Sequence, residues 1–279
     1  MQDVTAYCAD LVRTADRDSY LASLFAPAEH RQALFALYAF NAEISRVREA
    51  AREPMPGEIR LQWWREVVSG ERSGEAVANP VAAALLDAVA RYRLPASTLT
   101  DLIEAHRFDL YNEPMAATAD LESYARQTSS AIIGLAAQIL GAEAPAVTEP
   151  AGVALAIVDL LGALPLHASG GQLYVPADIL QRHGVSAEAV FAHQSTVGLR
   201  AALAELRDLA WHHLAASRRV LPQLPPQALP ALLPVAIVGP SLERLKRSDA
   251  FAPKDIPAWR RQWLIWRAAR NPARIARYV

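Results

Sequence analysis

One apolar stretch near the middle of the chain constrains the fold more than any other. Residues Gly152–Leu164 read GVALAIVDLLGAL, with Asp159 as their one charged side chain. A helix that is apolar on all sides is usually buried on all sides, so this stretch predicts a central helix. Pro165 follows and lacks the N–H that a helix interior needs, so we expect the helix to kink or end there. A buried helix with one carboxylate either lines a pocket or holds a structural acid that its neighbours satisfy.

The rest of the chain predicts an all-α protein. Segments rich in Ala, Leu and Arg lie between clusters of the 19 prolines and 12 glycines, and alternating strand patterns are nearly absent. We find no repeat or linker, and therefore expect one domain over residues 1–279 with about ten helices. Small residues within 129–140 would let another helix approach closely, and the helix at Gly152–Leu164 is the expected neighbour. Other expected helices cover Val4–Ser23, Glu29–Arg52, Asp120–Gly141, Thr196–Arg219 and Ile256–Arg270.

Charge and cysteine content exclude several classes of protein. The formal net charge is −1, which argues against a nucleic-acid partner. Cys8 is the only cysteine, so an internal disulfide is excluded. The start of the sequence does not resemble a signal peptide, and its apolar runs are shorter than the roughly 20 residues of a membrane span. We expect a cytoplasmic protein without a transmembrane segment, and a peripheral place at the inner membrane stays open.

Three local patterns each allow two interpretations. His106 stands among charged residues, where a surface position is favoured over a metal ligand. Trp259, Trp263 and Trp266 recur at helical spacing with arginines beside them, which favours packing on the core over an interface with a membrane or a protein. The polar residues of 45–49 form either a solvated helix end or the outer part of an inward face.

No Gly-rich phosphate loop, Gly-x-Ser-x-Gly elbow, His-Glu-x-x-His or Cys-x-x-Cys occurs. One all-α chemistry does fit the layout, because prenyl diphosphates bind Mg²⁺ through paired carboxylates on facing helices. The sequence carries a matching series of landmarks, and on these it resembles the squalene/phytoene synthase family over nearly its whole length. The landmarks are Arg31 with Ala36-Leu37-Tyr38-Ala39-Phe40, Asp109, Tyr124 before a small apolar helix, Gly152 through Tyr174-Val175-Pro176, and Gly184.

The resemblance implies an isoprenoid synthase fold around a central cavity, and a reaction that joins two prenyl diphosphates head to head with Mg²⁺. The family's first acidic motif has aspartates at the positions of Ser45, Arg46 and Glu49, so only Glu49 keeps a carboxylate here. Its second motif has aspartates at the positions of Ala163 and His167, which keep none.

Other departures point the same way. Gly162 and Gln172 replace two arginines of the family, and Asp159 stands where the family usually has Asn. A diphosphate carries about three negative charges that two or three divalent ions normally offset. Glu49 and Asp159 would hold at best one ion weakly, so we expect no metal or other cofactor. An enzyme with an altered site would use Mg²⁺ at these two residues.

The runs at 39–43, 163–167 and 183–186 resemble a divergent branch of the family, which contains the mitochondrial complex I assembly factor. This resemblance implies a non-catalytic assembly or binding factor. Its partner would be a subunit or assembly protein of a respiratory NADH dehydrogenase, with an isoprenoid or lipid as a further ligand. The alternative is a head-to-head prenyl diphosphate synthase of the squalene/phytoene type with an altered site. In both cases the cavity candidates are Arg31, Tyr38, Asn41, Ser45, Glu49, Asp109, Asp159, Ala163, His167 and Tyr174.

Overall fold

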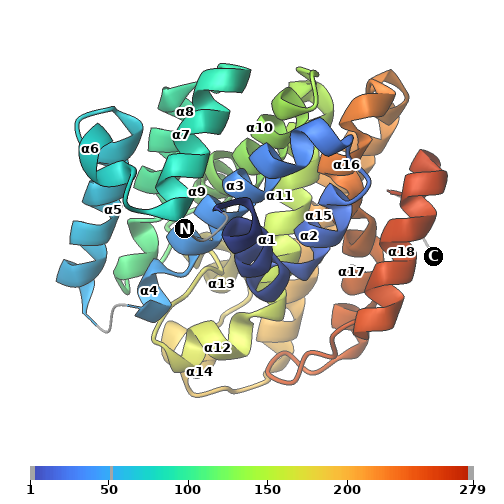
Figure 1. Ribbon diagram of the computed structural model, residues 1–279. Coiled ribbons are helices and arrows are strands. Elements are labelled where there is room, and N and C mark those ends of the chain that lie inside the picture. The colour runs from blue at the N-terminus through green and yellow to red at the C-terminus, as the bar shows by residue number, and fades with distance from the viewer. Residues whose placement is uncertain (1–3, 51–52, 276–279) are drawn as a thin grey trace.

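The computed structural model describes residues 4–50 and 53–275, and the only β-structure within them is an isolated bridge between Asp249 and Ala252. The prediction of an all-α protein is confirmed (Figure 1). The α-helices are α1 (Val4–Ala15), α2 (Arg17–Ser23), α3 (Ala28–Ser45), α4 (Val47–Ala50), α5 (Pro54–Val68), α6 (Ser73–Ala76), α7 (Pro80–Tyr92), α8 (Ala96–Ala105), α9 (Thr118–Ala125), α10 (Ala131–Ile139), α11 (Pro145–Gly162), α12 (Leu164–Ser169), α13 (Ala177–Arg182), α14 (Ala187–Phe191), α15 (Val197–Val220), α16 (Leu229–Leu232), α17 (Val238–Arg247) and α18 (Ala258–Arg270).

Shorter helical turns join several of these helices. Three of them matter for the site: η1 (Phe108–Leu110), the π-helical turn η2 (Arg126–Ser130) between α9 and α10, and η5 (Leu233–Ile237) before α17. The predicted helix over Val4–Ser23 is broken at Asp16, which caps α2. The predicted helix over Glu29–Arg52 is broken at Arg46, and Arg52 lies outside the described residues.

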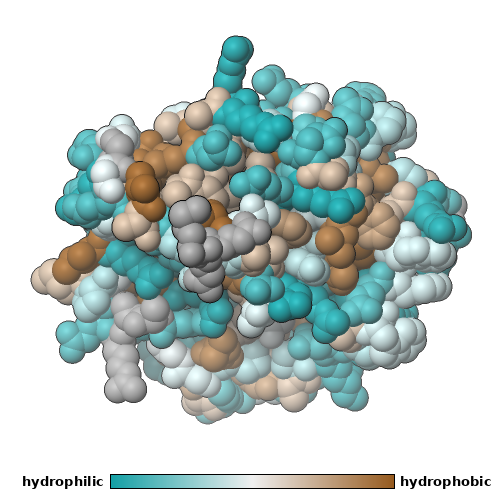
Figure 2. All heavy atoms as spheres, viewed as in Figure 1, coloured by the Kyte–Doolittle hydropathy of each residue, from teal (hydrophilic) through white to brown (hydrophobic). Residues whose placement is uncertain are grey.

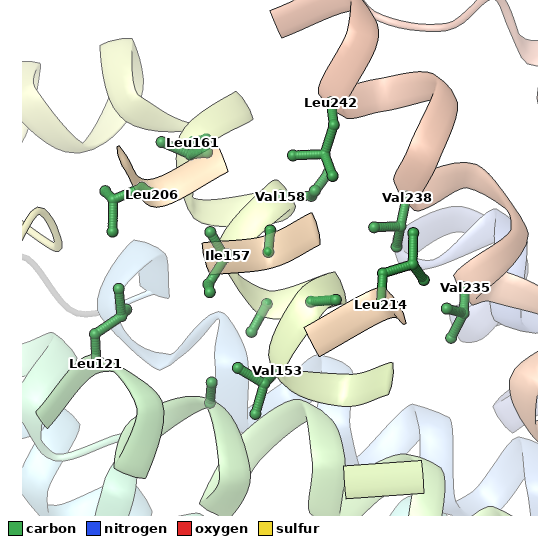
Figure 3. Close-up of a cluster of buried hydrophobic side chains, with 14 of the residues drawn as sticks. Leu121, Val153, Ile157, Val158, Leu161, Leu206, Leu214, Val235, Val238 and Leu242 are labelled. Atoms are coloured by element: carbon green, nitrogen blue, oxygen red, sulfur yellow. The ribbon is translucent and has the colours of Figure 1, made fainter. Parts of the chain in front are cut away.

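Helix α11 contains residues 152–162 of the apolar stretch and runs through the middle of the molecule, as predicted (Figure 1). It ends at Gly162, and Pro165 lies in the first turn of α12, so the expected break at the proline is confirmed. The long helix α15 packs along α11, and α17 packs on both. Apolar side chains of these helices meet in one core, shown in Figure 3 by Val153, Ile157, Val158, Leu161, Leu206, Leu214, Val238 and Leu242.

Helix α11 crosses the segment before α10 at very short range. A Cβ atom at Gly152 would lie 2.5 Å from the backbone nitrogen of Ser130, so only glycine fits there. The Ser130 hydroxyl donates a hydrogen bond to the Glu149 carbonyl at 2.7 Å across the same crossing. The prediction that small residues let these two helices approach closely is confirmed.

A second core lies on the other side of the molecule. It is formed mainly by α1, α3, α5, α7, α8 and α10, and the rings of Phe40 and Trp64 meet edge to face there at 5.1 Å. The cavity described below lies where α2, α3, α11, α12 and α18 come together.

Two stretches, Pro145–Gly162 and Pro226–Arg247, are long and apolar enough to cross a membrane by length and composition. Within the structure, 56% and 72% of their residues are buried, as in the core helices of any folded chain. This is weak evidence, so the absence of a transmembrane segment stays a prediction, as does the single domain over 1–279.

The expected packing of three tryptophans on the core is wrong. Trp259, Trp263 and Trp266 all lie exposed on α18, at the edge of the molecule (Figure 1). Elsewhere on the face drawn in Figure 2, hydrophobic residues form separate groups between hydrophilic ones.

Candidate functional site

A cavity of about 710 Å³ opens beside the second half of α11. Its walls come from the turn between α1 and α2, from α3, η1, α9, α11, α12 and α18, so segments from both ends of the chain meet there. Most of its charged and aromatic lining residues fall into three groups: the network around Asp109, the acidic wall next to Asp159, and the pair at the mouth formed by Arg46 and Glu49.

Most of the predicted candidates line this cavity. Arg31 and Tyr38 do not: the Arg31 guanidinium donates to the Ala26 carbonyl at 2.9 Å, and Tyr38 is buried in the second core. Tyr38 is still affected by a residue of the cavity wall: burial raises the pKa of its hydroxyl, and the charge of Asp16 raises it further. The predicted residues that line the cavity are Asn41, Ser45, Glu49, Asp109, Asp159, Ala163, His167 and Tyr174.

Asp109 is the centre of a buried hydrogen-bond network. The Tyr174 hydroxyl donates to its carboxylate at 2.6 Å, and the Tyr124 hydroxyl donates at 3.0 Å. The His106 ring nitrogen Nδ1 lies 2.6 Å from the same carboxylate, and must carry the proton because an ionised carboxylate only accepts. Burial, and next the Asp109 charge, raise the pKa values of Tyr124 and Tyr174, so both stay protonated donors.

Two further side chains hold this network in place. The Gln172 amide donates to the Asp109 carbonyl at 2.7 Å, which ties the turn after α12 to η1. The Arg48 guanidinium donates to the Leu110 carbonyl at 2.6 Å and to the Gly170 carbonyl at 3.3 Å. Asp109 therefore sits where three separate stretches of chain are fastened together.

The surface position expected for His106 is wrong. Its exposed fraction is 4%, and it lines the cavity beside Asp109. The other ring nitrogen, Nε2, has no hydrogen-bond partner among the residues that the structure describes. The neighbouring His167 ring packs on Tyr174 with centroids 4.6 Å apart, and burial lowers the pKa of His167 below its ordinary 6.5.

The second group is an acidic wall next to α11. Asp16 caps α2 by accepting from the Ser19 backbone N–H at 3.0 Å, and Asp18, two residues further on, is buried. Arg261, from α18, donates to the Asp18 carboxylate through Nε at 2.8 Å and also through Nη2. Burial opposes the charge on Arg261, but this ion pair more than offsets it, so the pKa of Arg261 lies above its ordinary value.

Asp159 projects from α11 into the cavity beside this wall. Its accessible surface is that of an exposed residue, but this surface faces the cavity, whose walls lie close enough to remove much of the bulk water around the carboxylate. Burial raises the pKa of Asp159 from 3.8 to about 7; Arg261 opposes the rise, whereas Asp16 and Asp18 add to it. Burial likewise raises the pKa of Asp16. Of the two interpretations of the apolar helix, lining a pocket is therefore correct.

The third group lies at the mouth of the cavity. Arg46 ends α3 and forms an ion pair with Glu49 at 2.9 Å, and both side chains are more than half exposed. Ser45 beside them is exposed too. The polar end of this helix is thus both solvated and part of the cavity rim, so each of the two interpretations describes part of it.

The residues present do not fit an Mg²⁺–diphosphate site. Glu49 is held in an ion pair with Arg46, and the side chain of Ala163 has no ligand atom. Within residues 4–50 and 53–275, no three His, Cys, Asp or Glu side chains are grouped to hold a metal ion. Mg²⁺ prefers octahedral oxygen ligands, which this arrangement does not supply. We therefore derive no chemistry through a metal at this site.

A narrow apolar pocket adjoins the polar cavity. The two share Leu160, His167 and Tyr174, and Leu121 and Leu206 close the apolar side. This apolar pocket is only about 10 Å³, the space of roughly one water molecule, so the open volume of the site is the polar cavity itself.

Sequence reasoning missed several lining residues. Asp16 carried a usable signal, because Asp followed three residues later by Ser fits a helix cap and predicts the break between α1 and α2. Nothing local to Arg261 indicates its pairing with Asp18, since 243 positions separate them. His106 and Tyr124 are recognisable only through Asp109, which each contacts.

Sequence comparison with known proteins identifies the family of this chain. The sequence profile of the family described as squalene/phytoene synthase matches residues 12–267. The complex I assembly factor 6 of Rattus norvegicus is 32% identical over 250 residues, which is 88% of this chain and 75% of that protein. The phytoene synthase of Mycobacterium tuberculosis is 28% identical over 178 residues, 63% of this chain and 58% of that protein.

Solved structures agree as well. A dehydrosqualene synthase in complex with a ligand superposes with a TM-score of 0.79 at 20% identity, covering 95% of each chain. The squalene synthase HpnC from Alicyclobacillus acidocaldarius superposes with a TM-score of 0.66 at 21% identity, over 96% of this chain and 93% of that one. The predicted isoprenoid synthase fold is confirmed.

Proposed function

Because the chain belongs to the squalene/phytoene synthase family, we propose that it is a member that does not join prenyl diphosphates and instead assists the assembly of a respiratory NADH dehydrogenase. The observation that carries the first half is the Arg46–Glu49 ion pair at the mouth. A guanidinium occupies the place of an acidic ligand and binds the one carboxylate left beside it. The mouth of the cavity then presents no paired carboxylates to Mg²⁺.

The charges inside the cavity support the same conclusion. Asp16, Asp18, Asp109 and Asp159 face it, whereas the one arginine of its inner wall, Arg261, is paired with Asp18. A diphosphate with about three negative charges would meet these carboxylates without metal ions to offset them. The cavity would tolerate a ligand whose polar end is neutral or positively charged far better than a diphosphate.

The assembly role is supported by relatives. Proteins named NADH dehydrogenase (ubiquinone) complex I assembly factor 6 match 87–88% of this chain, and those of rat and human are 32% identical to it. The cavity also supports a ligand: we infer an isoprenoid or other lipid that lies in the 710 Å³ cavity with its polar end at the Asp109 network.

A second function, prenyl diphosphate condensation at an altered site, is favoured by the tyrosines. Tyr124 and Tyr174 hold their hydroxyls in the cavity through Asp109, where they could place a proton. Asp159 adds a carboxylate that could take part. The two functions differ in one measurable respect, which is dependence on Mg²⁺.

The test is to incubate the purified protein with farnesyl and geranylgeranyl diphosphate, with and without Mg²⁺, and to follow melting temperature and product together. We expect no product and no metal-dependent shift. A variant that restores the carboxylates, Arg46→Asp with Ala163→Asp, is the positive control for metal binding. Condensation by the wild-type protein would refute the non-catalytic proposal. The assembly role is tested separately, by deleting the gene in its host and measuring assembled NADH dehydrogenase on native gels.

A further inference from the structure

Helix α18 has two faces of different character. On the inner face, Ile265 and Ala268 are buried against η5 and α2, and Arg261 reaches the cavity wall. On the outer face, Trp259, Trp263 and Trp266 are 69%, 43% and 45% exposed. Their spacing of four and three residues places all three on one side of the helix.

Arginines cover the exposed rings. The Arg267 guanidinium lies 4.1 Å from the ring centroid of Trp263, and that of Arg270 lies 4.5 Å from the ring centroid of Trp266. Helix α18 has no acidic residue, and besides Arg261, which is paired with Asp18 on the inner side, it carries Arg260, Arg267 and Arg270, although the whole chain has a net charge of −1. The outer face therefore combines aromatic rings with a local positive charge.

We propose that the outer face of α18 docks on an anionic lipid surface, with the helix lying along the interface. Tryptophan rings favour the headgroup region of a bilayer, because one edge is polar and the rest is apolar. Arginines beside them reach lipid phosphates while their stems stay on apolar surface. The helix is already folded and packed, so docking orders no new segment.

The size and shape of the face favour a lipid surface over a protein. Helix α18 has 13 residues, so it is about 20 Å long and presents about 200 Å² on one side. A stable protein interface buries about 800 Å² on each partner. An interfacial helix needs only one apolar face with basic residues beside it. The helix also lies at the edge of the molecule, where a flat surface can reach it (Figure 1).

The experiment uses the full chain and two kinds of vesicle, one of phosphatidylcholine alone and one containing phosphatidylglycerol as well. Co-sedimentation measures binding, and tryptophan quenching by brominated lipid locates the contact. We expect binding to the anionic vesicles only. Trp259→Ser with Trp263→Ser and Trp266→Ser should abolish it. Arg267→Gln and Arg270→Gln should each weaken it about fivefold.

A matched control removes exposed apolar residues elsewhere. Met55→Ser, Ile59→Ser and Val77→Ser alter side chains as exposed as Trp259 on the α5–α6 side, and should leave vesicle binding unchanged. Melting temperatures confirm that all variants fold, which is expected because the altered side chains face solvent. Wild-type protein that ignores anionic vesicles, or that binds both vesicles equally, overturns the proposal. Self-association through the same tryptophans without vesicle binding overturns it too.

Discussion

The buried carboxylate of Asp159 should make the stability of the protein depend on pH in a way that one substitution removes. Asp159→Asn keeps the size and polarity of the side chain but cannot ionise. In the folded protein, burial raises the pKa of Asp159 to about 7, whereas its ordinary value is 3.8. Between those values the folded state holds a proton that the unfolded state has lost, so stability falls as the pH rises.

The size of this effect follows from the two pKa values. At 1.36 kcal/mol per pH unit, ionising Asp159 in the folded protein costs about 4 kcal/mol relative to the unfolded chain. Part of its surface faces the cavity, where water screens the charge, so we discount this figure to about 2 kcal/mol. This loss of stability begins near pH 4 as the pH rises, and it is complete above about pH 7.

Urea unfolding of wild type and Asp159→Asn from about pH 4.5 to about pH 8 measures this effect. The two proteins should be close in stability at the acid end, and the variant should be more stable by about 2 kcal/mol at the alkaline end. Asp87→Asn, which alters an exposed aspartate of α7, should give a difference that does not change with pH. A variant less stable than wild type near pH 8 would refute the reasoning, because it would mean that the ionised carboxylate has a strong partner.

Three further changes test the crossing, the network and the wall, each by denaturant unfolding. Gly152→Ala should destabilise the protein by about 3 kcal/mol, because the new methyl group meets the Ser130 backbone. Asp109→Asn should lower the free energy of unfolding by about 3 kcal/mol, because an amide oxygen cannot accept hydrogen bonds from three donors as a carboxylate does. Arg261→Met should lower the free energy of unfolding by about 3 kcal/mol, because it leaves the buried Asp18 unpaired. Adding Asp18→Asn to this variant should recover most of the lost stability.

The sequence predicted the fold and much of the cavity for a physical reason. A helix as apolar as Gly152–Leu164 has to be buried, and its one carboxylate at Asp159 then has to face a cavity or a partner. Motif positions relative to Tyr174 located Ala163 and His167, and both line the cavity. The sequence pattern could not predict which distant residues would pair, such as Arg261 with Asp18.

The misread histidine and tryptophans show why local patterns fail in opposite directions. His106 lies next to charged residues in the sequence, yet its hydrogen bond to Asp109 makes its burial favourable. This hydrogen bond forms only in the folded structure, so the local sequence pattern does not reveal it. The aromatic spacing of α18 is that of a core helix. Its inner face, however, is formed by Ile265 and Ala268, and the tryptophans take the other side.

The structure shows which cavity positions can change while the fold is kept. Ser45 and Ala163 face the cavity, and their side chains make no hydrogen bond to any part of the chain that the structure describes, so changing them disturbs no packing. Asp109 is different, because it joins η1 to Tyr124 of α9 and to Tyr174 before α13. Under the proposed function, Ser45 and Ala163 are therefore free to change, whereas Asp109 is still needed to hold these segments together. The family's landmark at Asp109 is then evidence for the fold, and only Mg²⁺-dependent turnover would be evidence for the reaction.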